Sequence, residues 1–263
     1  METIYLTKVT KIKNGKKIVV EDTLIKEAKL DIVINDKKIT SMMAVPLDLK
    51  ELVVGYIIAE KIVNKVDDIK DITIKSEDER NYEILIDAKV SQKNIDKLDS
   101  EGVIVSGCGK AQSSQISPKA IEAKKITTNF SIKADLLFDE MQTFYGQCPL
   151  YEQTGCVHTA KLYIDKDTCF IGEDIAQHNT IDKAVGKALL NGYDTTHSFL
   201  MVSGRLSSEM VAKAIVHQVP ILASRTATTC RGLMIAERFG LTLIGFVRGK
   251  GMNIYRNPHR IEV

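Results

Sequence analysis

Residues 199–228 read FLMVSGRLSSEMVAKAIVHQVPILASRTAT, and one sequence pattern occurs twice within them. A short apolar run, at 199–202 and again at 220–223, is followed each time by a polar turn that contains Ser and Arg. Apolar runs of this length between turn residues are typical of buried strands, and the apolar periodicity of 208–217 is typical of a helix. The segment therefore predicts parallel strands joined by a helix.

The same alternation extends on both sides of this segment. Helices are expected at 133–145, 179–190 and 228–239, and strands at 157–164, 168–172 and 241–247. Strands and helices that alternate through short connections form layered α/β sheets. We expect a three-layer α/β domain over 129–263.

The first hundred residues follow a different pattern. Alternating apolar and polar residues predict strands at 17–20, 29–34, 37–42, 71–75 and 82–87. Asp48 and Glu51 have the spacing of a capping box, which predicts a helix from Asp48 to about Val63. We expect a smaller α+β domain over 1–102, followed by a polar loop over 103–128 that leads into the larger domain.

Composition excludes several classes of protein. The chain has 36 Lys and Arg against 34 Asp and Glu, no Trp and only 6% aromatic residues, which disfavours a nucleic-acid or membrane-surface binder. No apolar run approaches the roughly 18 residues of a membrane span, and no secretory leader is recognisable. We expect a cytoplasmic location, with neither nucleic acid nor membrane as a partner.

Arginine is concentrated where the predicted strands end. Seven of the eight Arg lie between Arg205 and Arg260, whereas residues 1–125 hold 21 of the 28 Lys. Arg205 and Arg225 follow strands and precede helices, and ligands of α/β sheets collect at the carboxyl ends of strands, where helix N-termini bind anions. These turns predict a site for a phosphate-bearing ligand; the alternative is ordinary helix capping by Ser207 and Thr228.

A third basic turn follows the last long strand. It reads Phe246-Val247-Arg248-Gly249-Lys250-Gly251, and it could form a backbone nest for phosphate. Because it lacks both the G-x-G-x-x-G pattern and the Walker pattern, an NAD or ATP enzyme is disfavoured.

Asp174, His178 and Asp182 are spaced four residues apart. On one face of a helix, a carboxylate that orients a histidine would suit general-base catalysis or support of a ligand. The alternative is structural, with Asp174 as a helix cap and Asp182 in a salt bridge to a lysine.

Cys108 differs in its setting from the other four cysteines. It lies between two glycines and before Lys110, in a polar segment, which favours an accessible and reactive thiolate. Cys148, Cys156 and His158 make a poor zinc pattern, because no second close pair completes four ligands. We therefore expect no metal site, with a buried Cys and a hydrogen-bonded His as the alternative to ligands.

Several motifs occur in one order along nearly the whole chain, from about Lys29 to Ile261. They are Val45-Pro46 with Asp48-Leu49, Gly55-Tyr56 and Glu60; Ser106-Gly107-Cys108-Gly109; Thr154-Gly155-Cys156 with His158 and Ala160; Glu173-Asp174 with His178 and Asp182-Lys183; Ser203 with Arg205, Ser207, Glu209-Met210 and Lys213; and Leu241-Thr242-Leu243 with Gly245-Phe246. With these motifs the sequence resembles the FdhD/NarQ family of formate dehydrogenase accessory sulfurtransferases.

The resemblance implies a cytidine-deaminase-like C-terminal domain, a small N-terminal domain and a homodimer. It also implies that the protein takes persulfide sulfur from a cysteine desulfurase and passes it to the molybdenum (or tungsten) bis-guanine-dinucleotide cofactor of formate dehydrogenase. Cys108 matches the persulfide cysteine, and Phe246 to Gly251 match the cofactor-binding stretch, which GDP would mimic. Arg205, Arg225 and His178 are further candidates for cofactor binding.

The sequence departs from the family pattern at two positions. Ala111 stands where family members often have the second cysteine of Cys-x-x-Cys, and Gln177 stands where an arginine is usual. A scheme with one persulfide thiol remains possible. The alternatives are a chaperone that binds the cofactor without transferring sulfur, and a zinc deaminase; the H-x-E and P-C-x-x-C motifs of the latter are absent.

Overall fold

The computed structural model describes residues 3–76, 78–92 and 123–263. Its smaller unit is a four-stranded sheet in the order β4-β3-β6-β5. The strands are β3 (Ala28–Ile34), β4 (Lys37–Ala44), β5 (Ile69–Ser76) and β6 (Asn81–Ala88), and α1 (Leu49–Ala59) lies between β4 and β5 in the chain. Alternate residues of β3 and β6 are buried and pack with the apolar side chains of α1, so one face of this sheet forms a core.

The larger unit is built on a six-stranded sheet in the order β13-β12-β11-β10-β8-β9. The strands are β8 (His158–Asp165), β9 (Thr168–Asp174), β10 (Phe199–Val202), β11 (Ile221–Ser224), β12 (Thr242–Arg248) and β13 (Gly251–Arg256). The neighbours β10, β11 and β12 are parallel, whereas the outer pairs are antiparallel. The three parallel strands place their carboxyl ends at one edge of the sheet.

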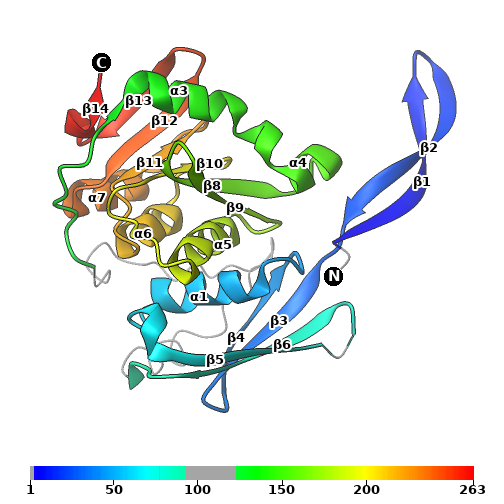
Figure 1. Ribbon diagram of the computed structural model, residues 1–263. Coiled ribbons are helices and arrows are strands. Elements are labelled where there is room, and N and C mark those ends of the chain that lie inside the picture. The colour runs from blue at the N-terminus through cyan, green and yellow to red at the C-terminus, as the bar shows by residue number, and fades with distance from the viewer. Residues whose placement is uncertain (1–2, 77, 93–122) are drawn as a thin grey trace.

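Helices lie on both faces of this sheet (Figure 1). One face packs against α5 (Gln177–Leu190), α6 (Ser208–Val216) and α7 (Cys230–Phe239), and the other against α3 (Ala134–Thr143) and α4 (Pro149–Thr154). Leu200 belongs to the first core and Met201 to the second, as the alternation along a strand requires. Short elements complete the chain: β7 (Ile132–Lys133), β14 (Ile261–Glu262), η1 (Val66–Asp68), η2 (Tyr145–Gln147) and η3 (Pro258–Arg260). The expected α/β class is thus confirmed.

Helix α1 of the smaller unit packs directly on α5 of the larger unit (Figure 1). Glycines make this close approach possible. A methyl group on Gly186 would overlap the backbone oxygen of Glu51, and one on Gly55 would overlap the backbone oxygen of Asp182. The two backbones therefore touch where other residues would hold them apart.

Gly186→Ala is expected to destabilise the protein by about 1–3 kcal/mol or more, because the added methyl must push two helix backbones apart. Thermal unfolding of the full chain would measure the loss. Gly146→Ala is the matched control, since its new methyl would meet its nearest atom, Glu152 Oε1, at an ordinary 3.6 Å. Equal melting temperatures for the two variants would contradict this account of the interface.

A buried ion pair reinforces the contact between the units. Lys183 Nζ on α5 lies 2.7 Å from the Asp174 carboxylate, and both side chains are 0% exposed. The same ammonium donates to the backbone oxygen of Val45 (3.1 Å), and the backbone N–H of Val45 donates to Asp174 (3.1 Å). The ion pair therefore also satisfies the backbone hydrogen-bonding groups of Val45, next to β4 of the smaller unit.

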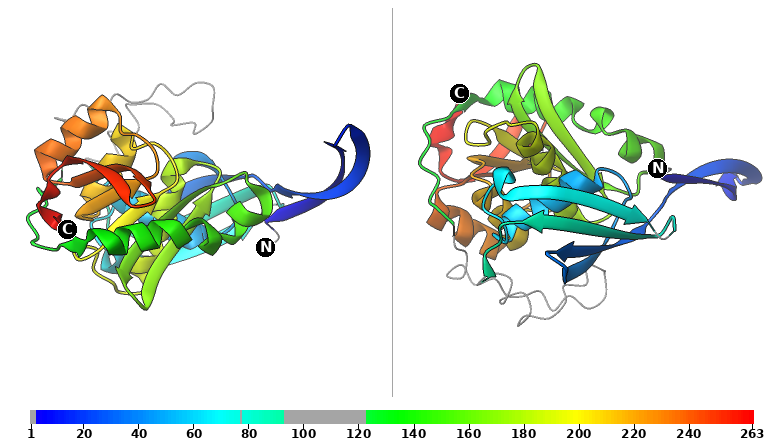
Figure 2. Two further views of the ribbon diagram at one scale, coloured as in Figure 1. Left: turned by 90° about the horizontal axis from the view of Figure 1, so that it is seen from above. Right: turned by 60° about the horizontal axis from the view of Figure 1, so that its bottom comes forward.

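A two-stranded arm precedes the smaller unit and extends away from the body of the molecule (Figures 1 and 2). It consists of β1 (Ile4–Lys13) and β2 (Lys16–Ile25), of which only residues 17–20 were predicted as a strand. At its base, Ile4 and Ile25 pack with Val45, Leu150 and Val157. Several large apolar side chains of the arm are exposed: Tyr5, Leu6, Ile12, Ile18, Val19 and Leu24.

Several helix boundaries differ from the prediction, most of all at α1. The capping box at Asp48 is wrong, because Asp48 has a left-handed backbone and no capping hydrogen bond, and its carboxylate pairs with Lys187 at 2.6 Å. Helix α1 ends at Ala59 rather than Val63. Of the two caps considered as the alternative to a ligand site, Ser207 does cap α6, but α7 is capped by Thr229 and not by Thr228.

The domain boundaries at 102 and 128 remain predictions, because they fall within or just after residues 93–122, which lie outside the described residues. In the part of the chain that the structure describes, no helix has the length and apolar composition needed to cross a membrane.

Candidate functional site

Three turns meet at the carboxyl edge of β10, β11 and β12 and are held together by hydrogen bonds. Ser224 Oγ donates to the Gly204 oxygen (2.7 Å), and the Leu206 N–H donates to the Ala227 oxygen (3.0 Å), which joins the first two turns. The third turn is attached by the Phe246 N–H, which donates to the Thr226 oxygen (3.1 Å). The edge is therefore a connected platform rather than three independent loops.

All three predicted arginines lie on this platform with exposed side chains, but they face different surroundings. Arg225 lies over the ring of Tyr145, with 5.2 Å between its guanidinium carbon and the ring centroid. Tyr145 belongs to the α3 face of the sheet. Arg248 donates from Nε to the Arg225 oxygen (3.2 Å). Arg205 instead lies beside α5 and α6, on the opposite face.

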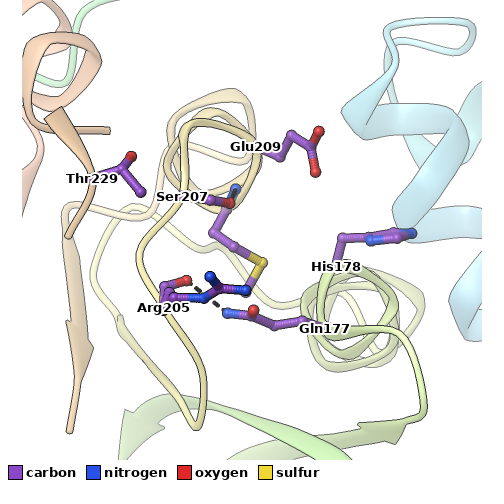
Figure 3. A pocket seen from close by; sticks show the side chains of 7 residues that line it. Gln177, His178, Arg205, Ser207, Glu209 and Thr229 are labelled. Atoms are coloured by element: carbon purple, nitrogen blue, oxygen red, sulfur yellow. Dashed lines mark hydrogen bonds between the residues drawn. The ribbon is translucent and has the colours of Figure 1, made fainter. Parts of the chain in front are cut away.

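A pocket of about 300 Å³ opens beside Arg205, between the first turns of α5 and α6 (Figure 3). Its lining consists of Gln177, His178, Arg205, Ser207, Glu209, Met210 and Thr229. Gln177 Nε2 donates to the Arg205 oxygen (2.7 Å) and fixes this wall to the turn. The pocket thus combines two predicted site residues, Arg205 and His178, from separate segments of the chain.

The pocket also contains residues that the sequence did not assign to a ligand. Ser207 was considered as a cap and as part of a motif, Gln177 only as a departure from the family pattern, and Glu209 and Met210 only as part of that motif. Their motif spacing around Arg205 was the available signal. Thr229 carries no such signal. It reaches the pocket only because β11 lies next to β10 in the sheet.

His178 is a neutral imidazole at physiological pH. Burial, and then the positive charge of Lys213, lower its pKa to about 4. It is not oriented by Asp174, which accepts hydrogen bonds from Val45 and Asn179 and pairs with Lys183. Asp182 pairs with Lys213 through contacts of 2.7 and 2.8 Å. The structural alternative is thus correct for Asp182, which pairs with a lysine, but wrong for Asp174, which ends β9 and does not cap α5. Among the described residues, neither carboxylate is placed to orient His178.

The cysteine and histidine motif near residue 156 also has a structural explanation. Cys148 is buried, donates to the Phe144 oxygen (3.2 Å), and has a pKa raised by burial to about 12. Cys156 is exposed, and His158 Nδ1 lies 3.2 Å from Ser203 Oγ. Burial, and then the charge of Arg205, lower the pKa of His158. Within residues 3–76, 78–92 and 123–263, no group of three or more His, Cys, Asp or Glu could hold a metal ion.

The basic stretch from Phe246 to Gly251 is the tip of the β12–β13 hairpin, where Arg248 pairs with Gly251. Phe246 and Gly249 have left-handed backbones, with φ of 54° and 55°. Lys250 pairs with Asp135 of α3 at 2.9 Å. This stretch, including Val247, lies on the same platform as Arg205 but does not line the pocket.

Cys108 lies outside the described residues. The nearest described flanks are fixed to the body: the Ser91 N–H donates to the Ile62 oxygen (2.8 Å), and the Ile126 N–H donates to the Phe239 oxygen (2.8 Å). Phe239 ends α7, so Ile126 lies at the sheet edge opposite to the platform.

Comparison with known proteins identifies the family to which this geometry belongs. The model of the FdhD/NarQ family matches residues 25–262. The chain belongs to the FdhD/NarQ family. Among its relatives, the sulfur carrier protein FdhD of Wolinella succinogenes is 37% identical over 243 residues, which cover 92% of this chain and 84% of the relative. The sulfur carrier protein FdhD of Geobacillus kaustophilus is 30% identical over 97% of this chain and 96% of its own.

A solved structure shares the fold of this chain. It is that of a protein from Desulfotalea psychrophila, named as a candidate formate dehydrogenase accessory protein, with a TM-score of 0.78 and 24% identity. The match covers 99% of this chain and 100% of the other. The family model begins only at residue 25, at the end of the arm, whereas the structural match includes the arm.

Proposed function

We propose that this protein is a sulfur carrier for formate dehydrogenase and that Cys108 carries the sulfur. The observation that carries this proposal is membership of the FdhD/NarQ family, with relatives named as sulfur carrier proteins that match almost end to end. The donor would be a cysteine desulfurase, and the acceptor would be the molybdenum or tungsten bis-guanine-dinucleotide cofactor, bound as a substrate. The protein would act as a sulfurtransferase in the cytoplasm and as a homodimer.

The loading step needs one thiol and no external oxidant. The Cys108 thiolate attacks the outer sulfur of the desulfurase persulfide, the S–S bond of the donor breaks, and the donor cysteine leaves as a thiolate. The product is a persulfide on Cys108, so a second cysteine at position 111 is not required for this step.

The chain is long enough for Cys108 to meet an acceptor on the platform. Ala123 lies fifteen positions after Cys108, and a chain of that length reaches at most about 50 Å. Helix α6, which runs from the platform toward the opposite edge, has nine residues and is about 14 Å long. An anchor at the opposite edge is therefore compatible with delivery at the platform.

The platform and its pocket fit part of such a substrate. The exposed Arg205, Arg225 and Arg248 supply charge for pyrophosphate groups, and Phe246, Val247, Gly249, Lys250 and Gly251 lie on the same edge. A volume of about 300 Å³ lies at the lower limit of small-molecule sites, so the pocket holds one end of a dinucleotide and not the whole. The proposal also includes a cytidine-deaminase-like fold for the larger unit.

Mass spectrometry tests the sulfur-carrier function directly. After incubation with a cysteine desulfurase and cysteine, the purified protein should gain one sulfur atom on the peptide that contains Cys108. A protein that binds cofactor but gains no sulfur would be the non-catalytic chaperone considered above, and the proposal would fail.

Arg205→Ala is expected to weaken GDP binding by about 10- to 100-fold, the scale of one charge-assisted contact. Calorimetry on the full chain would measure the affinity. Arg238→Ala is the control, because Arg238 lies on α7 outside the pocket lining, over the ring of Phe239. Unchanged affinity in the Arg205, Arg225 and Arg248 single variants would remove the phosphate site from the platform.

A further inference from the structure

We infer that Glu209 makes the pocket selective for a 2-amino-4-oxopyrimidine edge, the pair of adjacent N–H donors that guanine and pterin share. This inference deepens the proposed function, since it rests on the acceptor being a pterin linked to a guanine nucleotide. It assigns to Glu209 the recognition of the ring, a role distinct from the phosphate contact assigned to Arg205.

Glu209 is the carboxylate in the pocket that remains available for a ligand. Its side chain is exposed and lines the cavity, and among the described residues it has no hydrogen bond or ion pair. The neighbouring Lys213, one turn further along α6, has its pKa raised in part by the charge of Glu209, but its hydrogen bonds go to Asp182 at 2.7 and 2.8 Å. Asp174 is likewise held by Lys183. Among the described residues, the two buried carboxylates thus have hydrogen-bonding partners, whereas the carboxylate that faces the cavity has none.

The chemistry of a carboxylate selects the ligand edge. An ionised carboxylate only accepts hydrogen bonds, and its two oxygens can receive two parallel N–H groups. Guanine and pterin each present a ring N–H beside an exocyclic amino group, which match that geometry. The corresponding edge of adenine places an acceptor nitrogen beside its amino group, so it would leave one carboxylate oxygen facing a lone pair.

The rest of the pocket leaves Glu209 free to act in this way. His178, the other titratable group on the α5 side, is uncharged because its pKa is about 4, so it does not neutralise the carboxylate. Figure 3 shows Arg205 and Glu209 toward opposite ends of the pocket, with Ser207 between them. A ring at Glu209 could therefore extend its phosphate-bearing side toward Arg205, and Met210 contributes an apolar part of the lining.

Nucleotide selectivity measured on the full chain tests this assignment. Calorimetry with GDP, IDP, ADP and 6-hydroxymethylpterin should show GDP bound about 10- to 100-fold more tightly than ADP, with IDP, which lacks the 2-amino group, weaker than GDP. Glu209→Gln should weaken GDP binding by a similar factor and bring the GDP and ADP affinities together. Glu152→Gln is the matched control, an exposed first-turn glutamate of α4 outside the pocket lining.

The outcomes separate the two sources of the ring and the two proposals. Glu209-dependent binding of GDP but not of the free pterin assigns the guanine end of the substrate to this pocket, and the reverse assigns the pterin end. Equal wild-type affinities for GDP and ADP, a GDP to ADP ratio unchanged by Glu209→Gln, or no binding of any of the four compounds would overturn the inference. Sulfur loading of Cys108, measured on the same preparations, stands or falls independently and reports on the sulfur-carrier function alone.

Discussion

Cys108→Ala is expected to lower the activation of formate dehydrogenase by at least about 100-fold, because it removes the only atom to which the proposed mechanism attaches the sulfur. Folding and GDP binding should be unchanged, since neither depends on that thiol. The measurement is formate oxidation by a formate dehydrogenase matured with the wild-type or variant protein, together with the mass of the Cys108 peptide.

The remaining cysteines provide the controls. Cys156, Cys169 and Cys230 are exposed, so their single alanine variants should retain full activation. The buried cysteine that was expected as the alternative to a zinc ligand is Cys148, whereas Cys156 is exposed. Full activation by Cys108→Ala, or sulfur found on Cys156, would refute the assignment and favour the chaperone alternative.

Lys183→Met should cost about 3–5 kcal/mol of unfolding free energy, because it leaves the Asp174 carboxylate buried without its counter-charge. Methionine keeps most of the side-chain volume, so the loss reports on charge rather than on a cavity. Urea unfolding of the full chain measures the free energy of unfolding. The value is used only where the protein unfolds in a single cooperative transition.

Two further variants make this second result specific. Lys183→Met combined with Asp174→Asn should recover part of the loss, since asparagine removes the charge and can still accept the Val45 N–H. Lys65→Met breaks an exposed ion pair with Asp67 and should change stability by less than about 1 kcal/mol. Equal losses for Lys183→Met and Lys65→Met would show that the buried pair does not hold the two units together.

The elements that could be predicted from sequence are those whose signal is local. Strands β10 and β11 are buried on both faces, and the apolar runs at 199–202 and 220–223 reflect this burial directly in their composition. The end of α1 could not be predicted, because Ile62 and Val63 continue the apolar pattern while Lys61 takes a left-handed backbone that folds them back into the core. Strands β1 and β13 were missed, since their half-exposed, lysine- and asparagine-containing segments lack a clear apolar period.

The candidate site was predictable only in part, for a related reason. Arg205 could be placed from its strand-to-helix turn alone. The spacing of Asp174, His178 and Asp182 suggested a shared helical face, but α5 begins at Gln177, so Asp174 belongs to β9 and faces Lys183. Glu209 has no hydrogen bond to Lys213, because Lys213 pairs with Asp182 instead. Since Asp182 is distant in the sequence, this pairing could not be predicted from the sequence around Glu209.

Helix α5 gives the molecule a mechanical connection between its two units. Its first residues, Gln177 and His178, form one wall of the pocket, and eight residues further along Gly186 lies in backbone contact with α1. That distance is about 12 Å along a single uninterrupted helix. Because the backbones of α1 and α5 are in contact at Gly55 and Gly186, with no side chain between them, a displacement of α1 toward α5 would be passed to α5 directly. The packing between the two units and the shape of the pocket therefore depend on the same helix.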